Sequence, residues 1–449
     1  MSIIKNLKQL TKKRFNFFTT PSHSQSPAFK TILGKDYYKY DLSEVDGLDN
    51  LNCPQGSILD LHEKLKDIYY SGYSHVLTNG STQGMLALML ATLKKDDKVL
   101  CAVNCHKCVH NGLVLTGAKP IWLYPHFNNE FSVYTSISSS VVEKAIEENP
   151  DAKCLILTCP TYDGILSNIE KIAEICKNND VILIIDEAHG ALWNYDRTIG
   201  SPAILSGADA SVQSLHKTCG SVNPAGLVHL SMSSKISKTQ LLDALNLIST
   251  SSPSFLLIAN VEETINYLSS KKGKKEVYNL TQNAMNLISK IKTFDYLDLY
   301  YSNNDITKFL VHPKNISAEE ASEIIYKKFK IECEIQHKNA LTFVCGVGTT
   351  EKKLKQLAKA LAYINKISKK RDVLYVNEIV PPEKEMLMTP QEAYYSEYEE
   401  VFPLDAVDKA CAQIVTTYPP GIPILTYGER VTMQHLNFIN HENKIRIVK

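Results

Sequence analysis

The sequence predicts an α/β protein built around a mostly parallel sheet that helices cover on both faces. Between about residues 74 and 230, short and nearly all-apolar runs alternate with amphipathic stretches. A strand that is apolar throughout is typical of a sheet buried on both sides. Parallel strands need crossover connections, and the amphipathic stretches supply these as helices.

Six runs are the candidate strands of this sheet, and the segments between them are the candidate helices. The strands are expected at 75–78, 98–103, 119–123, 153–158, 181–185 and 210–214, with helices for example at 82–93 and 169–177. In open α/β sheets, ligands bind beyond the carboxyl ends of the strands. The residues that follow each run are therefore the first candidates for a functional site.

The length of 449 residues allows two or three core-forming units. After residue 253 strand signals thin out, long polar helices dominate, and the Lys-rich stretches 271–275 and 366–371 are expected to be solvated connections. We therefore expect an N-terminal segment (1–50), a large domain that contains the parallel sheet (51–250), a smaller α/β domain (251–370) and a C-terminal segment (371–449).

The composition narrows the classes of function. A net charge of +1 gives no electrostatic case for nucleic acid, and no apolar run approaches the roughly 20 residues needed to span a bilayer. Eleven cysteines are too dilute for a disulfide framework, and Cys105-x-x-Cys108 lacks a second pair at zinc-site spacing, so no metal is expected. A cytoplasmic protein that binds a small molecule is the simplest interpretation. The acid-free first 35 residues are either an amphipathic arm or a targeting segment.

A small, hydroxyl-rich turn follows the first predicted strand. Residues 79–84 are Asn-Gly-Ser-Thr-Gln-Gly and lead into a helix. Free N–H groups at a helix start, together with the hydroxyls of Ser81 and Thr82, form an anion site suited to a phosphate. Alternatively, Ser81 is a plain N-cap.

An acid and a lysine follow two later strands. Asp186 comes directly after the run 181–185, where burying an acid needs a cationic partner; a helix N-cap is the alternative. Lys217 follows the run 210–214, and a lysine amine becomes a nucleophile towards an aldehyde when desolvation or a nearby cation lowers its pKa. An exposed lysine is the alternative.

His106 follows the run 98–103 in the segment Asn-Cys-His-Lys. Placed over a flat aromatic ring, a histidine can stack on one face and move a proton. A structural histidine is the alternative.

Taken together, these segments resemble the Orn/Lys/Arg decarboxylase family, pyridoxal-phosphate (PLP) enzymes of the aspartate-aminotransferase fold type I. The absence of a long N-terminal wing makes the chain similar to the family's short form. The matching segments are 47–51, 79–82, 104–107, 160–164, 186–191, 216–218, 250–254 and 418–423.

The resemblance implies a role for each candidate residue. Lys217 would bind PLP as a Schiff base, and Asp186 would keep the ring nitrogen protonated. His106 would cover one ring face, Ala188 would lie beneath the other, and His189 would be near the ring hydroxyl. The phosphate would be bound by Ser81, Thr82, Ser214 and His216.

The reaction implied is loss of the carboxylate of a basic amino acid (arginine, lysine or ornithine) as CO2. The pocket must then hold the scissile bond perpendicular to the ring. Glu399 and Glu429 are candidate contacts for the distal cation. The alternatives are an aminotransferase or lyase of the same fold, or a catalytically silent regulatory relative.

The resemblance also implies a homodimer or higher homo-oligomer with sites at the subunit interface. Residues 250–254 and His23 would then come from, or lie against, the partner chain; a Pro-containing turn and a surface histidine are the respective alternatives. Departures from the family pattern cluster around the site: Leu192-Trp193 replaces a second histidine, Leu215 replaces a threonine, and 219–224 differs from the usual run. Substrate choice is therefore less certain than cofactor binding.

Overall fold

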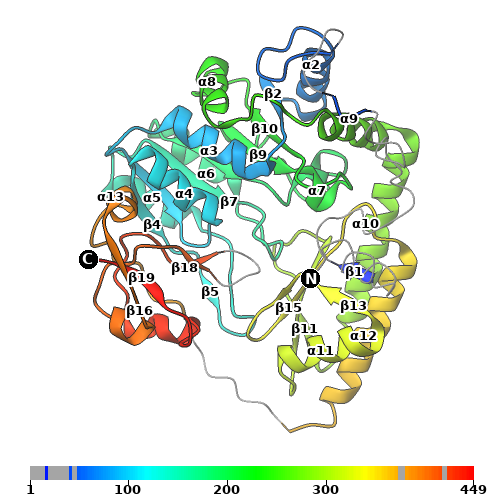
Figure 1. Ribbon diagram of the computed structural model, residues 1–449. Coiled ribbons are helices and arrows are strands. Elements are labelled where there is room, and N and C mark those ends of the chain that lie inside the picture. The colour runs from blue at the N-terminus through cyan, green and yellow to red at the C-terminus, as the bar shows by residue number, and fades with distance from the viewer. Residues whose placement is uncertain (1–15, 19–39, 43–47, 373–379, 417–421) are drawn as a thin grey trace.

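A computed structural model describes residues 16–18, 40–42, 48–372, 380–416 and 422–449, and its centre is a seven-stranded sheet (Figure 1). The strand order is β2 (Tyr73–Leu77), β10 (Gly226–Leu230), β9 (Ala210–Ser214), β8 (Ile182–Asp186), β7 (Cys154–Thr158), β3 (Lys98–Ala102) and β4 (Lys119–Leu123). Neighbours from β9 to β4 pair in parallel, whereas β10 is antiparallel to both β9 and β2.

All six predicted strands are present in this sheet, with ends shifted by two residues at most. Strand β10 was not predicted. It is a five-residue run just after Pro224. Periodicity in so short an apolar run does not distinguish a strand from a buried turn of helix.

Helices cover both faces of the sheet, as predicted. Along β8, Ile184 packs into a core that includes Met85 of α3, and Ile185 packs into a second core that includes Ile172 of α6. Successive strand residues point to opposite faces, so this alternation places one helical layer on each side. The covering helices are α2 (Ser57–Tyr69), α3 (Gly80–Thr92), α4 (Lys107–Thr116), α5 (Ser139–Glu148), α6 (Ile169–Asn178) and α8 (Lys238–Ile248).

A second, smaller sheet follows the large one along the chain. Its antiparallel order is β11 (Leu297–Leu299), β12 (Lys308–Pro313), β15 (Leu341–Val344) and β14 (Ile335–Gln336). Helices α9 (Phe255–Ser269), α10 (Lys271–Ile291), α11 (Ala318–Phe329) and α12 (Glu351–Ser368) accompany it, and β1 (Asn16–Phe18) pairs with β13 (Ile331–Cys333).

The two Lys-rich stretches are not the connections that the sequence predicted. Residues 271–275 form the start of α10, where the Ser270 side chain accepts a hydrogen bond from Gly273 N as an N-cap, and 366–368 end α12. A capped helix tolerates a run of lysines because its exposed face keeps them in water.

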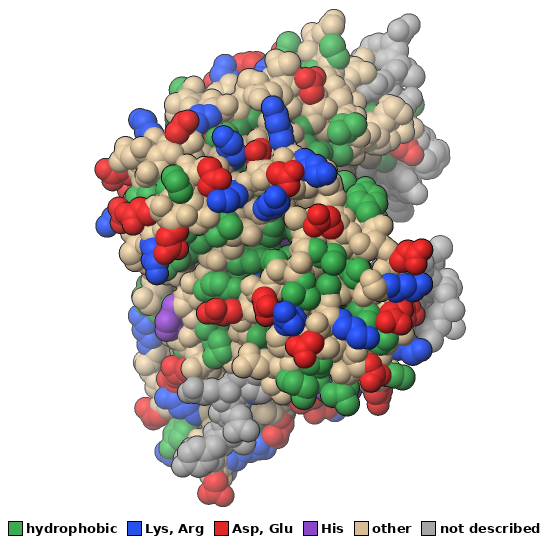
Figure 2. All heavy atoms as spheres, turned by 90° about the vertical axis from the view of Figure 1, so that its left-hand side faces the viewer, with side chains coloured by type: hydrophobic (Ala, Val, Ile, Leu, Met, Phe, Trp, Pro, Cys, Tyr) green, Lys and Arg blue, Asp and Glu red, His purple; other side chains and the backbone are tan. Residues whose placement is uncertain are grey.

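The C-terminal segment packs beside α4, at the left of Figure 1. It contains α13 (Pro390–Tyr395), the antiparallel pair β16 (Tyr398–Val401) and β19 (Ile445–Val448), and the pair β17 (Val415–Thr416) and β18 (Pro423–Leu425). Charges of both signs are interspersed over this face in Figure 2. Short elements complete the described chain: α7 (Leu215–Thr218), β5 (Phe127–Asn128), β6 (Val133–Tyr134), η2 (Ala191–Asn194), η3 (Pro403–Ala406) and η4 (Met433–Phe438).

Two further features of the described chain bear on the predictions. None of its helices combines the length and apolarity that a membrane span requires. All eleven cysteines are free, and Cys105 and Cys108 are buried. The four-part division of the chain stays a prediction.

Candidate active site

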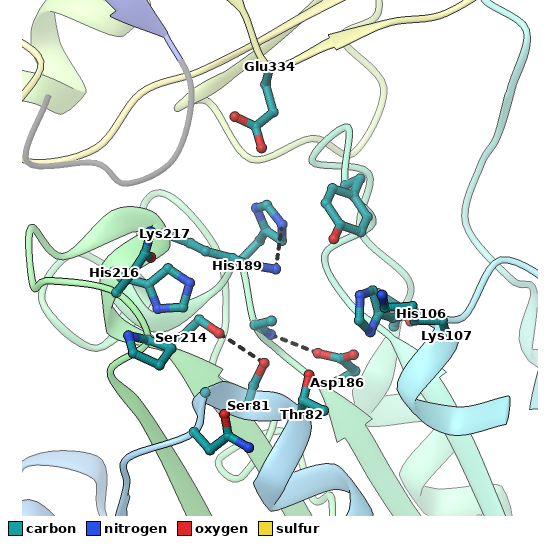
Figure 3. Close-up of a pocket in the computed structure, with 17 residues that line it drawn as sticks. Ser81, Thr82, His106, Lys107, Asp186, His189, Ser214, His216, Lys217 and Glu334 are labelled. Carbon is teal, nitrogen blue, oxygen red and sulfur yellow. Dashed lines mark hydrogen bonds between the residues drawn. The ribbon is translucent and has the colours of Figure 1, made fainter. Parts of the chain in front are cut away.

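A cavity of about 480 Å³ opens at the carboxyl ends of the parallel strands (Figure 3). This is the position that open α/β sheets use for ligands, and the volume suits a small molecule. The structure brings together all nine residues predicted from the sequence, because each lines this cavity: Ser81, Thr82, His106, Asp186, Ala188, His189, Ser214, His216 and Lys217.

One end of the cavity is formed by the start of α3. Asn79 is the N-cap, so Ser81 lies inside the first turn and the N-cap alternative for Ser81 is wrong. The Ser214 hydroxyl donates to Ser81 Oγ at 2.9 Å. Strand β10 can lie close to the start of α3 because residue 226 is glycine. A Cβ at this position would lie 2.9 Å from Ser81 N. The N–H groups at the start of a helix, together with these hydroxyls, are the kind of groups that anion sites use.

Asp186 ends β8 and is 4% exposed. Its Oδ1 accepts a hydrogen bond from Ala188 N at 3.1 Å, and the next helical turn begins only at Ala191, so Asp186 is not a helix N-cap. Burial raises the pKa of Asp186, while Lys217 and the Ala188 N–H oppose that rise. A cation in the cavity would therefore be attracted to this carboxyl group.

Lys217 lies in the short helix α7 that follows β9. Its Nζ is 3.1 Å from His189 Nε2 and 4.9 Å from the centroid of the Tyr162 ring. Burial lowers the pKa of Lys217, whereas Asp186 and Glu334 oppose that change. A lysine with a lowered pKa has more neutral, nucleophilic amine at neutral pH.

Three histidines around the cavity are held neutral at pH 7. Burial, with a smaller effect of the Lys217 charge, lowers the pKa of His106 to about 4, and burial also lowers that of His216 to about 4. The pKa of His189 is also well below its usual value because it is buried next to Lys217. His106 additionally caps α4, since its Nδ1 accepts from Cys108 N at 3.2 Å. His216 Nδ1 donates to Ala225 O at 2.9 Å.

Sequence reasoning missed several lining residues. Glu334 lies between β13 and β14 and points into the cavity from the wall opposite Ser81 and Thr82 (Figure 3). Tyr162 belongs to the segment 160–164, which was recognised as a family motif but given no role. The other lining residues not predicted are Asn79, Gly80, Lys107, Thr158, Asn223 and Pro224.

Other residues considered from the sequence lie elsewhere. Glu399, on the exposed strand β16, pairs with Lys409 at 3.6 Å, and Glu429 is buried against Lys384 at 2.9 Å, so neither lines the cavity. Residues 250–254 also lie outside its lining, and Ser254 caps α9. His23 lies outside the described residues.

Two buried polar atoms at the cavity have no hydrogen-bond partner in the described chain. They are His189 Nδ1 and Thr158 Oγ1. Buried polar atoms in native proteins are nearly always paired, so unpaired atoms around a cavity indicate a polar ligand.

The sequence matches the family described as "Orn/Lys/Arg decarboxylase, major domain" over residues 2–333, and the corresponding C-terminal domain over residues 374–446. The chain belongs to the Orn/Lys/Arg decarboxylase family. The resemblance predicted from the sequence is thereby confirmed. Membership also makes the chain one of a family of decarboxylases.

Known members of the family are similar to the chain along nearly its whole length. The arginine decarboxylase of Halalkalibacterium halodurans is 27% identical over 451 residues, which cover 95% of this chain and 90% of that protein. Among solved structures, lysine decarboxylase A from Pseudomonas aeruginosa has a TM-score of 0.80 at 17% identity, covering 95% of this chain and 77% of that one. The Francisella novicida lysine decarboxylase has a TM-score of 0.79 at 16% identity, with coverages of 99% and 83%. These likenesses confirm the predicted type I fold.

Proposed function

We propose that this chain is a PLP-dependent decarboxylase of a basic amino acid. The observation that carries the proposal is the single cavity that Lys217, Asp186 and the start of α3 surround, with the Glu334 carboxylate on the opposite wall. The family's decarboxylases and the named arginine and lysine decarboxylases among the relatives support it.

The residues present fit PLP. The start of α3 with Ser81 and Ser214 suits a phosphate, and the buried Asp186 suits a protonated ring nitrogen. The unpaired His189 Nδ1 and Thr158 Oγ1 supply polar partners for a ligand in the same cavity. Thr82, His216, His106 and Ala188 would complete the contacts to the phosphate and to the two ring faces.

When bound, PLP supplies an electron sink for the electron pair that remains on the α-carbon after the carboxylate leaves. The chain's own residues would do the rest. Lys217 would bind the cofactor aldehyde covalently and, once the substrate amine has replaced it, hold a proton at Nζ beside His189. Asp186 would keep the ring nitrogen protonated, and His106 would exclude water from one face.

Glu334 supports a basic substrate. Its carboxylate points towards Lys217 and His189 from the far wall of the cavity, where the distal cation of an amino acid bound at Lys217 would extend (Figure 3). A charge-assisted hydrogen bond to an ammonium or guanidinium would select a basic side chain over an apolar one. Glu334 therefore takes the role first suggested for Glu399 or Glu429.

The test is an amino-acid screen with the purified full-length protein loaded with PLP. We expect the yellow colour of lysine-bound cofactor and CO2 release from arginine, lysine or ornithine. Lys217→Ala should abolish both, whereas Lys144→Ala, at an exposed lysine paired with Glu148, should change neither.

The same screen separates the alternatives. Keto-acid or pyruvate formation without CO2 would instead identify an aminotransferase or lyase. A protein that binds PLP, releases no CO2 from any amino acid and keeps its biological effect as Lys217→Ala would be a silent regulatory relative.

We further propose that the protein is a cytoplasmic homodimer or higher homo-oligomer with sites at the subunit interface. The named lysine decarboxylase neighbours support an amino-acid substrate, and the oligomer follows from the family resemblance of the sequence. Sedimentation of the purified chain, with and without PLP, would test the assembly.

A further inference from the structure

A fully buried ion pair lies behind the candidate active site. Lys308 Nζ is 2.6 Å from Asp305 Oδ2, and the two side chains are 0% and 1% exposed. Asp305 precedes β12, and Lys308 is the first residue of that strand. Buried ion pairs are often no more stabilising than apolar residues of the same size, so stability alone does not explain the presence of this one.

The loop that carries Tyr162 contacts the backbone and the side-chain stem of these two residues. The backbone N of Asp305 donates to Gly164 O at 2.7 Å. Gly164 has a φ of +89°, and a Cβ at this position would lie 2.8 Å from Lys308 Cβ. Only glycine therefore allows the turn 160–164 to pack this closely on the Lys308 side chain.

The pair also holds the segment that carries His189. Lys308 Nζ donates to His189 O at 3.3 Å, and Trp193 Nε1 donates to Asp305 Oδ2 at 3.1 Å. Trp193 is one of the positions at which the sequence departs from the family pattern, and it is almost fully buried. Both ends of the segment 189–193 are thus hydrogen-bonded to this ion pair.

The two loops meet at Lys217. The Tyr162 and His189 rings have centroids 4.6 Å apart, and both lie beside the Lys217 amine, at 4.9 Å for the Tyr162 centroid and 3.1 Å for His189 Nε2. A shift of either loop would therefore change the surroundings of the amine.

The charge of Lys308 and the burial of Lys217 both lower the pKa of Lys217. Burial is the main cause of the lowered pKa of Lys217, and Lys308 lowers it further. Lys308 also lowers the pKa of His189. The other titratable groups that face or influence the Lys217 amine are Asp186, Glu334, Cys108, His106, His189, His216 and Tyr162.

We propose that Asp305 and Lys308 are positioning residues of the active site. Their ion pair holds the segment of His189 beside Lys217 and places the Lys308 cation next to the His189 backbone, while the stem of Lys308 packs on the loop of Tyr162. This inference rests on the proposed function, because it takes the amine to be the group that binds the PLP aldehyde.

The test measures how fast PLP attaches to Lys217 in the purified full-length apoprotein as a function of pH. Borohydride reduction traps the attached cofactor, and peptide mass spectrometry quantifies it at Lys217. Lys308→Met should raise the midpoint of the pH dependence, because loss of a neighbouring cation raises a lysine pKa. Attachment near neutral pH should then be roughly twofold to tenfold slower. Lys314→Met removes an exposed lysine of the same strand region, paired with Asp298, and should leave the midpoint unchanged.

A second variant separates the loss of the Lys308 charge from the effects of misfolding. Asp305→Asn combined with Lys308→Met leaves neither charge unpaired, and it should shift the midpoint in the same direction by a smaller amount, because removal of the Asp305 anion opposes removal of the Lys308 cation. General structural damage would slow attachment at every pH without moving the midpoint. The inference is wrong if the folded Lys308→Met protein has the same midpoint as Lys314→Met. Where Lys308→Met does not fold, the double variant takes its place in this comparison. If the wild-type chain attaches no PLP at Lys217 at any pH, the proposed function fails and this inference fails with it.

Discussion

Replacing Lys384 by methionine should destabilise the C-terminal segment by about 3–5 kcal/mol, because a buried carboxylate would lose its cation. Lys384 Nζ lies 2.9 Å from Glu429 Oε2, and the two side chains are 4% and 0% exposed. Glu429 also accepts from Thr426 N at 2.9 Å and lies 3.2 Å from His435 Nε2. These contacts would remain, but neither of them supplies the lysine charge.

A double variant isolates the charge from the packing. Lys384→Met with Glu429→Gln removes both charges and should recover most of the loss, since a neutral pair needs no buried counterion. Urea unfolding followed by intrinsic fluorescence is a suitable assay, because Lys384 Nζ lies 5.6 Å from the Trp122 ring centroid. A loss below about 1 kcal/mol in the single variant, which is typical of an exposed pair, would refute the reasoning. So would a double variant as unstable as the single one.

The same cluster predicts a pH dependence. Burial raises the pKa of Glu429, but Lys384 and His435 outweigh it and leave the pKa below its usual value. The stabilisation is therefore fully present above the usual carboxyl pKa and is lost as the pH falls through the lowered folded value. In Lys384→Met no lysine charge opposes the effect of burial, so Glu429 should become protonated at a higher pH than in the wild type. The difference in unfolding free energy between the two proteins should therefore shrink as the pH falls.

Three further predictions concern the cavity. Asp186→Asn should lower kcat by roughly tenfold to a hundredfold, the value of one hydrogen bond to a charged group, and steady-state CO2 release would measure it. Ser81→Ala should weaken PLP affinity roughly twofold to tenfold, because it removes one neutral hydroxyl, and a titration of the apoprotein followed by absorbance would detect it. Glu334→Gln should lower kcat/KM for a basic amino acid roughly tenfold to a hundredfold without slowing PLP attachment at Lys217, since loss of this carboxylate lowers the Lys217 pKa; an equal loss of attachment would contradict the role given to Glu334.

The sequence allowed the large sheet and one side of the cavity to be predicted. Asp186, Lys217 and His106 each follow an apolar run, and parallel strands bring their carboxyl ends to one edge whatever the details of packing. The antiparallel strand β10 was missed, because five apolar residues after a proline do not reveal their direction.

The other side of the cavity depends on contacts between residues far apart in the sequence. Glu334 reaches the cavity from a loop next to the smaller sheet, and nothing in the residues around it marks that position. Glu429 was considered for the same role, but it is bound to Lys384, 45 residues earlier in the chain. Whether an acid is buried against a lysine or lines the cavity is decided by tertiary packing rather than by local pattern.

Glu334 is attached to a different sheet from the residues that would hold the cofactor. Under the proposed function, mutations at residues 333–337 would change the contact with the distal group of the substrate, while the strand ends that carry Lys217 and Asp186 stay as they are. Exchanging residues 333–337 with those of a relative should therefore alter substrate preference without rebuilding the cofactor site.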